Sequence, residues 1–162
     1  MRPLTGYTLV ECLHEGPASV IYRARDDRDG APVVLKMRNP EGAHAFGLGK
    51  LRHEHMVLKG LDVPGVIKLR AFLDQEDGMA LVFDDFGGEP LASRLQQRKL
   101  DLVTFLSIAV QIAEILGQIH AQHIIHKDIN PKNILIEGAA RSGHRLQHFD
   151  PDVARGAERQ EP

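Results

Sequence analysis

The sequence has no tryptophan, a single cysteine and only 5% aromatic residues in 162 positions. Cys12 has no second cysteine with which to form a disulfide inside the chain, so we expect a reducing compartment and a cytoplasmic protein. The first 16 residues also lack the apolar run and the small-residue cleavage pattern of a secretory signal. The remaining composition, 43% hydrophobic and 26% charged residues, is typical of one soluble globular domain.

An excess of basic residues is also missing. The chain has 20 Lys and Arg against 22 Asp and Glu, a net charge of −2. A surface that binds nucleic acid needs a basic stripe, so we expect no nucleic-acid partner. The most apolar stretch, residues 102–116, is interrupted by Thr104, Ser107, Gln111 and Glu114, and we therefore expect no membrane span.

The first half of the chain predicts a sheet. Runs rich in β-branched and aromatic residues predict short strands at residues 7–13, 19–25, 32–37, 66–74 and 78–86. One amphipathic helix is predicted at about residues 43–61. The mixed charges from Arg23 to Asp29 are expected to be only the solvated end of a hairpin, and Cys12 is predicted to be an inert core residue.

The second half predicts a long helix and a loop. Asp101 is a favourable N-cap, and apolar residues after it recur every three or four positions, which predicts a buried helix of about five turns. The residues of this face are Leu102, Phe105, Leu106, Ala109, Ile112, Ala113, Leu116 and Ile119. Pro131 prevents the helix from continuing, and residues 134–136 form an extended apolar run. Residues 137–162 contain few large apolar side chains, so this tail is predicted to be mostly disordered.

The strongest chemical signal lies at residues 126–133, between the predicted helix and the short strand. The segment His-Lys-Asp-Ile-Asn-Pro-Lys-Asn resembles the catalytic loop of protein kinases, H-R-D-L-x-x-x-N. The resemblance implies that Asp128 accepts the proton of an attacking hydroxyl and that Asn133 holds a Mg²⁺ ion bridging the phosphates of ATP. The alternative is an ordinary loop in which Asp128 and Asn133 only cap backbone groups.

A second segment resembles another kinase motif. Residues 33–36, Val-Val-Leu-Lys, are similar to the V-A-I-K strand, whose lysine contacts the α- and β-phosphates and pairs with a glutamate on the next helix. The resemblance assigns these roles to Lys36 and Glu54. A lone Lys–Glu pair on a surface would carry little weight, but the order and spacing of the two motifs make this one informative.

Residues 81–88 resemble the hinge strand of the same family. The resemblance implies that Phe83 is the gatekeeper beside the nucleotide and that the backbone from Asp84 to Phe86 hydrogen-bonds adenine. The alternative for Phe83 and Phe86 is plain core packing.

The loop that covers the phosphates matches less well. Aligning Ile21 with the valine of the family's V-Y-x-A strand leaves Gly16 as the single match to G-x-G-x-x-G, with His14 and Ser19 at the other glycine positions. Pro17 also removes one backbone donor. The resemblance places Gly16 and Ile21 beside the nucleotide, and we expect weaker binding than a fully glycine-rich loop provides.

Two further departures concern the loop and the metal. Lys127 and Asn130 replace the arginine of H-R-D and the loop lysine, a variant that resembles the N-terminal kinase-like domain of large multidomain microbial sensor kinases. At the position of the D-F-G aspartate, the best alignment has His148. Mg²⁺ prefers oxygen ligands, so an imidazole is a poor replacement, and Asp150 and Asp152 are the candidate substitutes.

Together these motifs imply an α+β, protein-kinase-like fold. We expect a five-stranded antiparallel N-lobe with one helix and the hinge at residues 1–86, a truncated, mainly helical C-lobe at residues 87–136, and an irregular tail at residues 137–162. The implied function is phosphoryl transfer from ATP, with Mg²⁺, to Ser or Thr of a protein substrate in signal transduction.

Three other interpretations stay open. The chain is alternatively an inactive pseudokinase that binds a signalling partner, a small-molecule phosphotransferase of the aminoglycoside-kinase type, or the product of a disrupted reading frame. Without the helices that normally cover it, the helix that begins at Leu102 is expected to expose apolar surface and to support self-association or partner binding.

Overall fold

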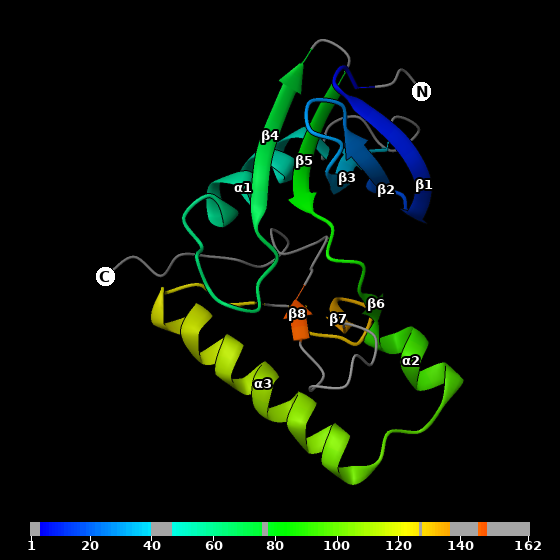
Figure 1. Cartoon of the computed structure of the whole chain (residues 1–162). Helices are drawn as coiled ribbons and strands as arrows, with labels where there is room; N and C mark the ends of the chain where they lie inside the picture. Colours follow the sequence, from blue (N-terminus) through cyan, green and yellow to red (C-terminus); the bar gives the residue numbers. More distant parts are fainter. Residues whose placement is uncertain (1–3, 40–46, 76–77, 127, 137–145, 149–162) are drawn as a thin grey trace. The chain divides into compact units, whose positions relative to one another are not determined.

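The computed structural model describes residues 4–39, 47–75, 78–126, 128–136 and 146–148. The chain divides into two compact units. The N-terminal unit consists of Met1–Gly60 and Lys68–Phe86, and the C-terminal unit consists of Leu61–Ile67 and Gly87–Pro162. Each unit has its own sheet and its own buried residues (Figure 1).

The N-terminal unit is built on a five-stranded antiparallel sheet. Its strands are β1 (Tyr7–Glu15), β2 (Ser19–Asp26), β3 (Pro32–Arg38), β4 (Leu69–Gln75) and β5 (Gly78–Asp84). Their spatial order is β1-β2-β3-β5-β4, which leaves β1 and β4 at the edges. The predicted five-stranded antiparallel sheet is confirmed.

Strands β3 and β5 are buried on both faces because they occupy the middle of the sheet. On one face, their alternate residues join a hydrophobic cluster made of Leu4, Tyr7, Ala24, Val33, Leu35, Met37, Ala80 and Val82. The intervening residues Lys36, Leu81 and Phe83 point to the opposite face, where α1 packs against β3 and β5. This second face carries the chemistry described below.

Helix α1 (Gly47–Leu58) covers that second face. The prediction of about residues 43–61 extends beyond the helix at its C-terminal end, and residues 43–46 lie outside the described part. Leu51, Glu54 and Leu58 are buried, which is the spacing of one helix face. His55 stacks on Phe72 of β4, with ring centroids 4.4 Å apart and planes 9° apart.

One residue of β1 differs from its prediction. Cys12 is exposed rather than part of the core. The physical reason is that β1 is an edge strand whose pairing with β2 is irregular on both sides of this residue, between Leu9 and Glu11 and between Cys12 and His14. Each irregularity shifts which side chains point inward, so strand alternation alone cannot predict burial here.

The C-terminal unit contains two helices and a small sheet. Helices α2 (Leu91–Gln97) and α3 (Leu102–Ala121) precede the loop that contains Asp128 and Asn133. The strands β6 (Glu89–Pro90), β7 (Ile134–Ile136) and β8 (Leu146–His148) form a three-stranded antiparallel sheet. The sequence patterns predicted α3 and β7 but not α2, β6 or β8. Strand β8 lies within the tail that we predicted to be mostly disordered, and it forms by pairing with β7.

Helix α3 starts where the sequence predicts but buries a different face. The Asp101 carboxylate accepts hydrogen bonds from the Thr104 backbone N–H and hydroxyl, both at 2.8 Å. Ile108, Ile115 and Ile119 are the buried residues of the helix. Of the eight residues predicted to form the buried face, only Ile119 is buried, so that prediction is wrong. The helix is apolar on most sides, and periodicity therefore does not distinguish its inner face from its outer one.

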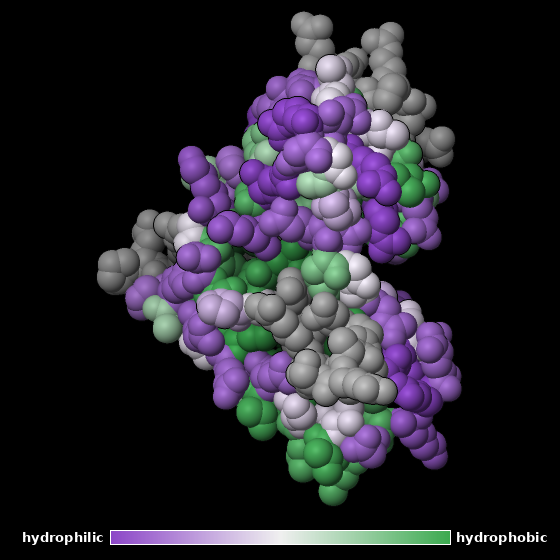
Figure 2. All heavy atoms as spheres, in the orientation of Figure 1, coloured by the Kyte–Doolittle hydropathy of each residue, from purple (hydrophilic) through white to green (hydrophobic). Residues whose placement is uncertain are grey.

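The outer face of α3 is strongly apolar. Leu102, Val103, Phe105, Leu106 and Val110 are between 51% and 78% exposed. Figure 2 shows the resulting hydrophobic patch at the bottom of the view, where α3 begins. The expectation of exposed apolar surface is confirmed. By length and composition α3 is also long and apolar enough to cross a membrane. A mostly buried core helix of a soluble protein passes the same test, whereas only 11% of the apolar window of α3 is buried.

Candidate functional site

A buried ion pair lies on the second face of the N-terminal sheet. Lys36 of β3 donates from Nζ to both carboxylate oxygens of Glu54 on α1, at 2.9 and 2.7 Å. The two side chains are only 3% and 2% exposed. The pairing predicted from the sequence is therefore present, and removing either partner would leave a charge buried without compensation.

The strand register places other candidate residues around Lys36. Ile21 of β2 and Leu81 of β5 are the cross-strand neighbours of Lys36. Cross-strand neighbours share a face, so Ile21 and Lys36 lie side by side on the face that α1 covers. Ile21 and Phe83 are both buried, which agrees with core packing as well as with a role beside a ligand.

The last residue of β5 and the first residue of the linker after it are each bound to the sheet by an arginine. Arg23 of β2 donates from Nε to the Asp85 carboxylate at 2.7 Å and from Nη1 to Glu11 at 2.7 Å. The hydrogen bond to Asp85 raises the pKa of Arg23 above its usual range. Arg70 of β4 lies 3.5 Å from the carboxylate of Asp84. Both ion pairs hold the start of the predicted hinge against the sheet.

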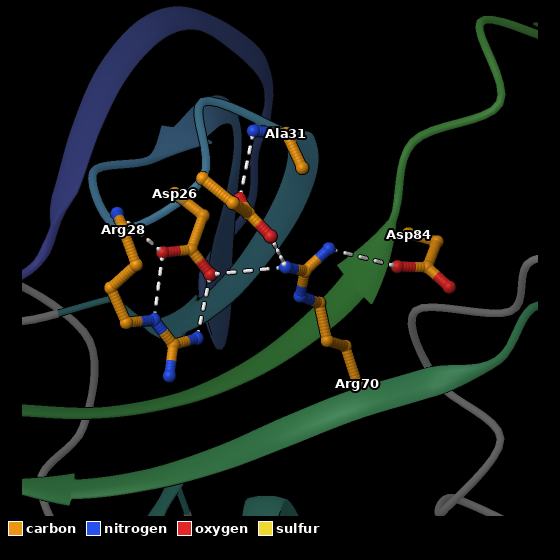
Figure 3. Close-up of polar contacts among 6 residues, drawn as sticks. Asp26, Arg28, Ala31, Arg70 and Asp84 are labelled. Atoms are coloured by element: carbon orange, nitrogen blue, oxygen red, sulfur yellow. Dashed lines mark hydrogen bonds and ion pairs between the residues drawn. The ribbon is translucent and has the colours of Figure 1, made fainter.

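Arg70 is also part of a larger charge cluster at the β2–β3 turn (Figure 3). The side chain of Asp26 is fully buried and accepts hydrogen bonds from the Arg28 backbone N–H at 3.1 Å and from its guanidinium at 2.9 and 2.6 Å. Arg70 lies 3.4 Å from the same carboxylate and donates to Asp29. The hydrogen bonds from Arg28 lower the pKa of Asp26 to about 2.

This cluster corrects the interpretation of the charge run from Arg23 to Asp29 as only a solvated hairpin end. Asp26 is buried because the chain turns from β2 into β3 at this point. The Arg70 side chain also reaches it from β4, 44 positions later in the sequence. A buried carboxylate needs several donors to offset its desolvation, and the partners of Asp26 supply them.

The β1–β2 turn uses its own backbone groups. The Gly16 N–H donates to the Ser19 carbonyl at 2.9 Å, and the Gly16 carbonyl accepts from the Asn39 side chain at 2.8 Å. A Cβ on Gly16 would lie 3.0 Å from the His14 ring. Both backbone groups of Gly16 are therefore engaged in hydrogen bonds inside the N-terminal unit rather than directed toward a phosphate, in line with the expectation of a weak phosphate loop.

In the C-terminal unit, the segment after α3 brings Asp128 and Asn133 together. Helix α3 ends in a turn at His123, whose φ of +58° is in the left-handed region. The Asn133 side-chain amide donates to the Asp128 backbone carbonyl at 3.0 Å and to its carboxylate at 3.1 Å. Asn133 is buried and Asp128 is exposed. The Asp128 carboxylate thus accepts a hydrogen bond from a buried amide and is also exposed to solvent.

Two further residues brace this loop. The Asp128 N–H donates to Nδ1 of His126 at 3.2 Å, which requires the His126 tautomer with its proton on Nε2. Asn130 donates from Nδ2 to the other carboxylate oxygen of Asp128 at 3.0 Å. The sequence marked Asn130 only as a departure from the kinase pattern. An Asn just before a proline is a turn signal, which indicated the bond from the Lys132 N–H to the Asn130 side chain but not the bond from Asn130 to Asp128.

The metal ligands are less complete. Among the described residues, no group of three or more His, Cys, Asp or Glu side chains could hold a metal ion. Asn133 and Asp128 supply an amide oxygen and a carboxylate, a donor set suited to Mg²⁺ but too small to bind it alone. His148 pairs with Ile134 in the small sheet, and Asp150 and Asp152 lie outside the described residues.

Comparison with known proteins agrees with these motifs. Residues 7–161 match the family model for the protein kinase domain. The chain is 26% identical over 132 residues to serine/threonine-protein kinase PkaB of Streptomyces coelicolor, an alignment that covers 81% of this chain and 31% of that protein. It is 26% identical over 148 residues to human serine/threonine-protein kinase ULK3, covering 90% and 31%, and 30% identical over 128 residues to serine/threonine-protein kinase dkf-2 of Caenorhabditis briggsae, covering 78% and 11%. The chain thus spans about a third or less of the length of these relatives.

Proposed function

Because this chain belongs to the protein kinase domain family, we propose that it binds Mg·ATP and transfers the γ-phosphoryl group to a Ser or Thr hydroxyl of a protein. The observation that carries the proposal is the buried pair of Lys36 and Glu54. A buried ion pair is seldom more stable than apolar residues of the same volume, so stability alone does not explain it. The need to hold the Lys36 ammonium group in a fixed place near the phosphates explains the pair.

The candidate residues of the N-terminal unit other than Gly16 each have a role in this proposal. Lys36 contacts the α- and β-phosphates, and Glu54 keeps its ammonium group in place. Ile21 and Phe83 lie beside the base, and the backbone of Asp84 to Phe86 bonds to it. The ion pairs of Asp84 and Asp85 support this assignment, because they restrain the backbone that would recognise the base.

Asp128 has the geometry of the group that receives the proton. In the proposed step, the substrate hydroxyl oxygen bonds to the γ-phosphorus, the bond from that phosphorus to the bridging oxygen of ADP breaks, and the hydroxyl proton passes to the Asp128 carboxylate. Mg²⁺ would neutralise charge on the phosphates, with the Asn133 side-chain oxygen and, in our proposal, Asp150 among its ligands.

Calorimetric titration with Mg·ATP tests the binding half of the proposal. We expect Lys36→Met to weaken binding at least about tenfold, since it removes one phosphate contact worth about 1.4 kcal/mol or more. Lys68→Met is the matched control, because Lys68 is an exposed lysine of the same unit. Absence of binding to the unaltered chain would refute the proposal.

Transfer of labelled phosphate to Ser- and Thr-containing peptides tests the chemical half, with Asp128→Asn as the inactive reference. A second candidate function is nucleotide or partner binding without transfer. It is favoured by the engaged backbone of Gly16 and by His148 at the aspartate position. Binding of Mg·ATP without any transfer would select this second function.

We also propose a second copy of the chain as a partner, through the apolar outer face of α3. The exposed Leu102, Val103, Phe105, Leu106 and Val110 support it, because contiguous apolar surface favours association in water. A cytoplasmic location is proposed on the exposed free thiol of Cys12.

A further inference from the structure

The carboxylate of Asp128 is held by two neutral amides, one on each oxygen. Asn133 donates to Oδ2 at 3.1 Å, and Asn130 donates to Oδ1 at 3.0 Å. We propose that Asn130 is a positioning residue for phosphoryl transfer, which fixes the rotation of the Asp128 carboxylate so that its open lone pairs face the substrate hydroxyl. This inference rests on the proposed function.

The orientation of the Asn130 amide is determined by its other contacts. Its Oδ1 accepts a hydrogen bond from the Lys132 N–H at 2.9 Å. Because only the oxygen end of the amide can accept, the nitrogen end must face Asp128. The Asn130 backbone carbonyl also accepts from the Asn133 N–H at 3.0 Å, so the residue is bonded on both its side chain and its backbone.

Two hydrogen bonds restrict the Asp128 carboxylate more than one does. A carboxylate bonded at a single oxygen can still rotate about its Cβ–Cγ bond, whereas bonds to both oxygens select one rotation. Each oxygen has two acceptor positions, and one amide occupies one of them, so each keeps a position for an incoming hydroxyl. Asp128 is exposed, which leaves those positions accessible.

The uncharged character of Asn130 is part of the arrangement. The kinase catalytic loop carries lysine at this position, and here the donor has no charge. Asn130 therefore orients the carboxylate without itself adding a positive charge, which would make the carboxylate a weaker proton acceptor.

A purely local role for Asn130 is the competing explanation, because its Oδ1 closes a turn with Lys132. Asn130→Asp separates the two roles. It keeps the oxygen that accepts from Lys132, and it replaces the donor to Asp128 with a second carboxylate oxygen. Two like charges at about hydrogen-bond distance repel, so Asp128 would rotate away while the turn persists.

The first test does not require activity. In the full ¹⁵N-labelled chain, the Asn130 side-chain amide signals are assigned by their loss in Asn130→Asp, and their hydrogen exchange with solvent is measured by NMR. We expect these hydrogens to exchange more slowly in the unaltered chain than in Asp128→Ala, because the hydrogen bond to the Asp128 carboxylate protects them. Equal exchange in the two proteins would show that the hydrogen bond is absent in solution and would overturn the proposal.

The second test measures transfer. We expect Asn130→Asp to lower kcat by about tenfold to a hundredfold, the effect of a misplaced catalytic group, with an unchanged unfolding midpoint. Asn130→Lys, which restores a donor but not the turn oxygen, should keep more of kcat than Asn130→Asp. Gln96→Glu is the control, since it adds the same charge on the exposed side of α2.

The outcomes separate the two hypotheses. If the unaltered chain transfers phosphate and Asn130→Asp transfers it equally well, the positioning role is refuted while the proposed function stands. If the unaltered chain binds Mg·ATP and transfers nothing, the proposed function fails and the positioning role fails with it, whatever the NMR signals show.

Discussion

The pair of Lys36 and Glu54 allows stability and function to be tested separately. Glu54→Gln replaces a carboxylate by an amide of nearly the same shape and leaves the Lys36 charge buried. Both side chains are at most 3% exposed, so water cannot replace the lost carboxylate without rearrangement. Removing one member of such a pair costs about 3–5 kcal/mol.

The double variant Lys36→Met/Glu54→Met provides the contrast. It removes both charges and keeps apolar volume between β3 and α1. Replacement of a buried ion pair by apolar residues is typically neutral or stabilising by about 1–4 kcal/mol. We therefore expect the double variant to be at least as stable as the unaltered chain, while Glu54→Gln is much less stable.

Urea unfolding followed by circular dichroism measures these differences, because the chain has no tryptophan for fluorescence. With a slope of about 2 kcal/mol per M, a loss of about 4 kcal/mol lowers the midpoint by about 2 M. Titration of Mg·ATP on the same samples should show binding lost in the stable double variant. Nucleotide binding by that variant at the affinity of the unaltered chain would refute the role of Lys36, and an unchanged midpoint for Glu54→Gln would refute the buried pair.

Three other predictions concern the rest of the molecule. The hydrogen bonds of Asp26 lower its pKa to about 2, so its contribution to stability is present above about pH 4 and is lost as pH falls toward 2. Unfolding midpoints measured from pH 6 to pH 2 should show this loss of stability in the unaltered chain and not in Asp26→Asn. Arg23→Ala should raise the dissociation constant for Mg·ATP, because it frees the linker after β5. The control Arg52→Ala breaks an exposed ion pair elsewhere in the same unit and should change that constant less than twofold, which is about 0.4 kcal/mol. Equal effects of the two variants would contradict the linker assignment. Sedimentation velocity should show self-association of the unaltered chain and a monomer for Phe105→Glu combined with Leu106→Glu, and a monomer in both would exclude the α3 face as a self-association surface.

The strands and the long helix were predictable because their signals are local. Runs such as residues 32–37 and 78–84 are rich in β-branched and apolar residues, and a strand buried on both faces selects such residues. Asp101 likewise indicated the start of α3, because an N-cap needs only its own side chain and the next three residues.

The two pairs of site residues were predictable for a different reason. Lys36 and Glu54 come from different elements, and nothing local joins them; their pairing was inferred from the resemblance to kinase motifs, and the structure contains it. Asp128 and Asn133 are five residues apart in one loop, which Pro131 keeps out of a helix, so their contact is mostly local.

The family, the strands and the loop that carries Asp128 follow from residue type and from spacing along the chain. The buried face of α3, the enclosure of Asp26 by Arg28 and Arg70, and the hydrogen bond from Asn130 to Asp128 became known from the fold. Burial and hydrogen bonding depend on which groups pack against a side chain. An all-round apolar helix or a run of mixed charges is compatible with several neighbours, and only the fold selects among them.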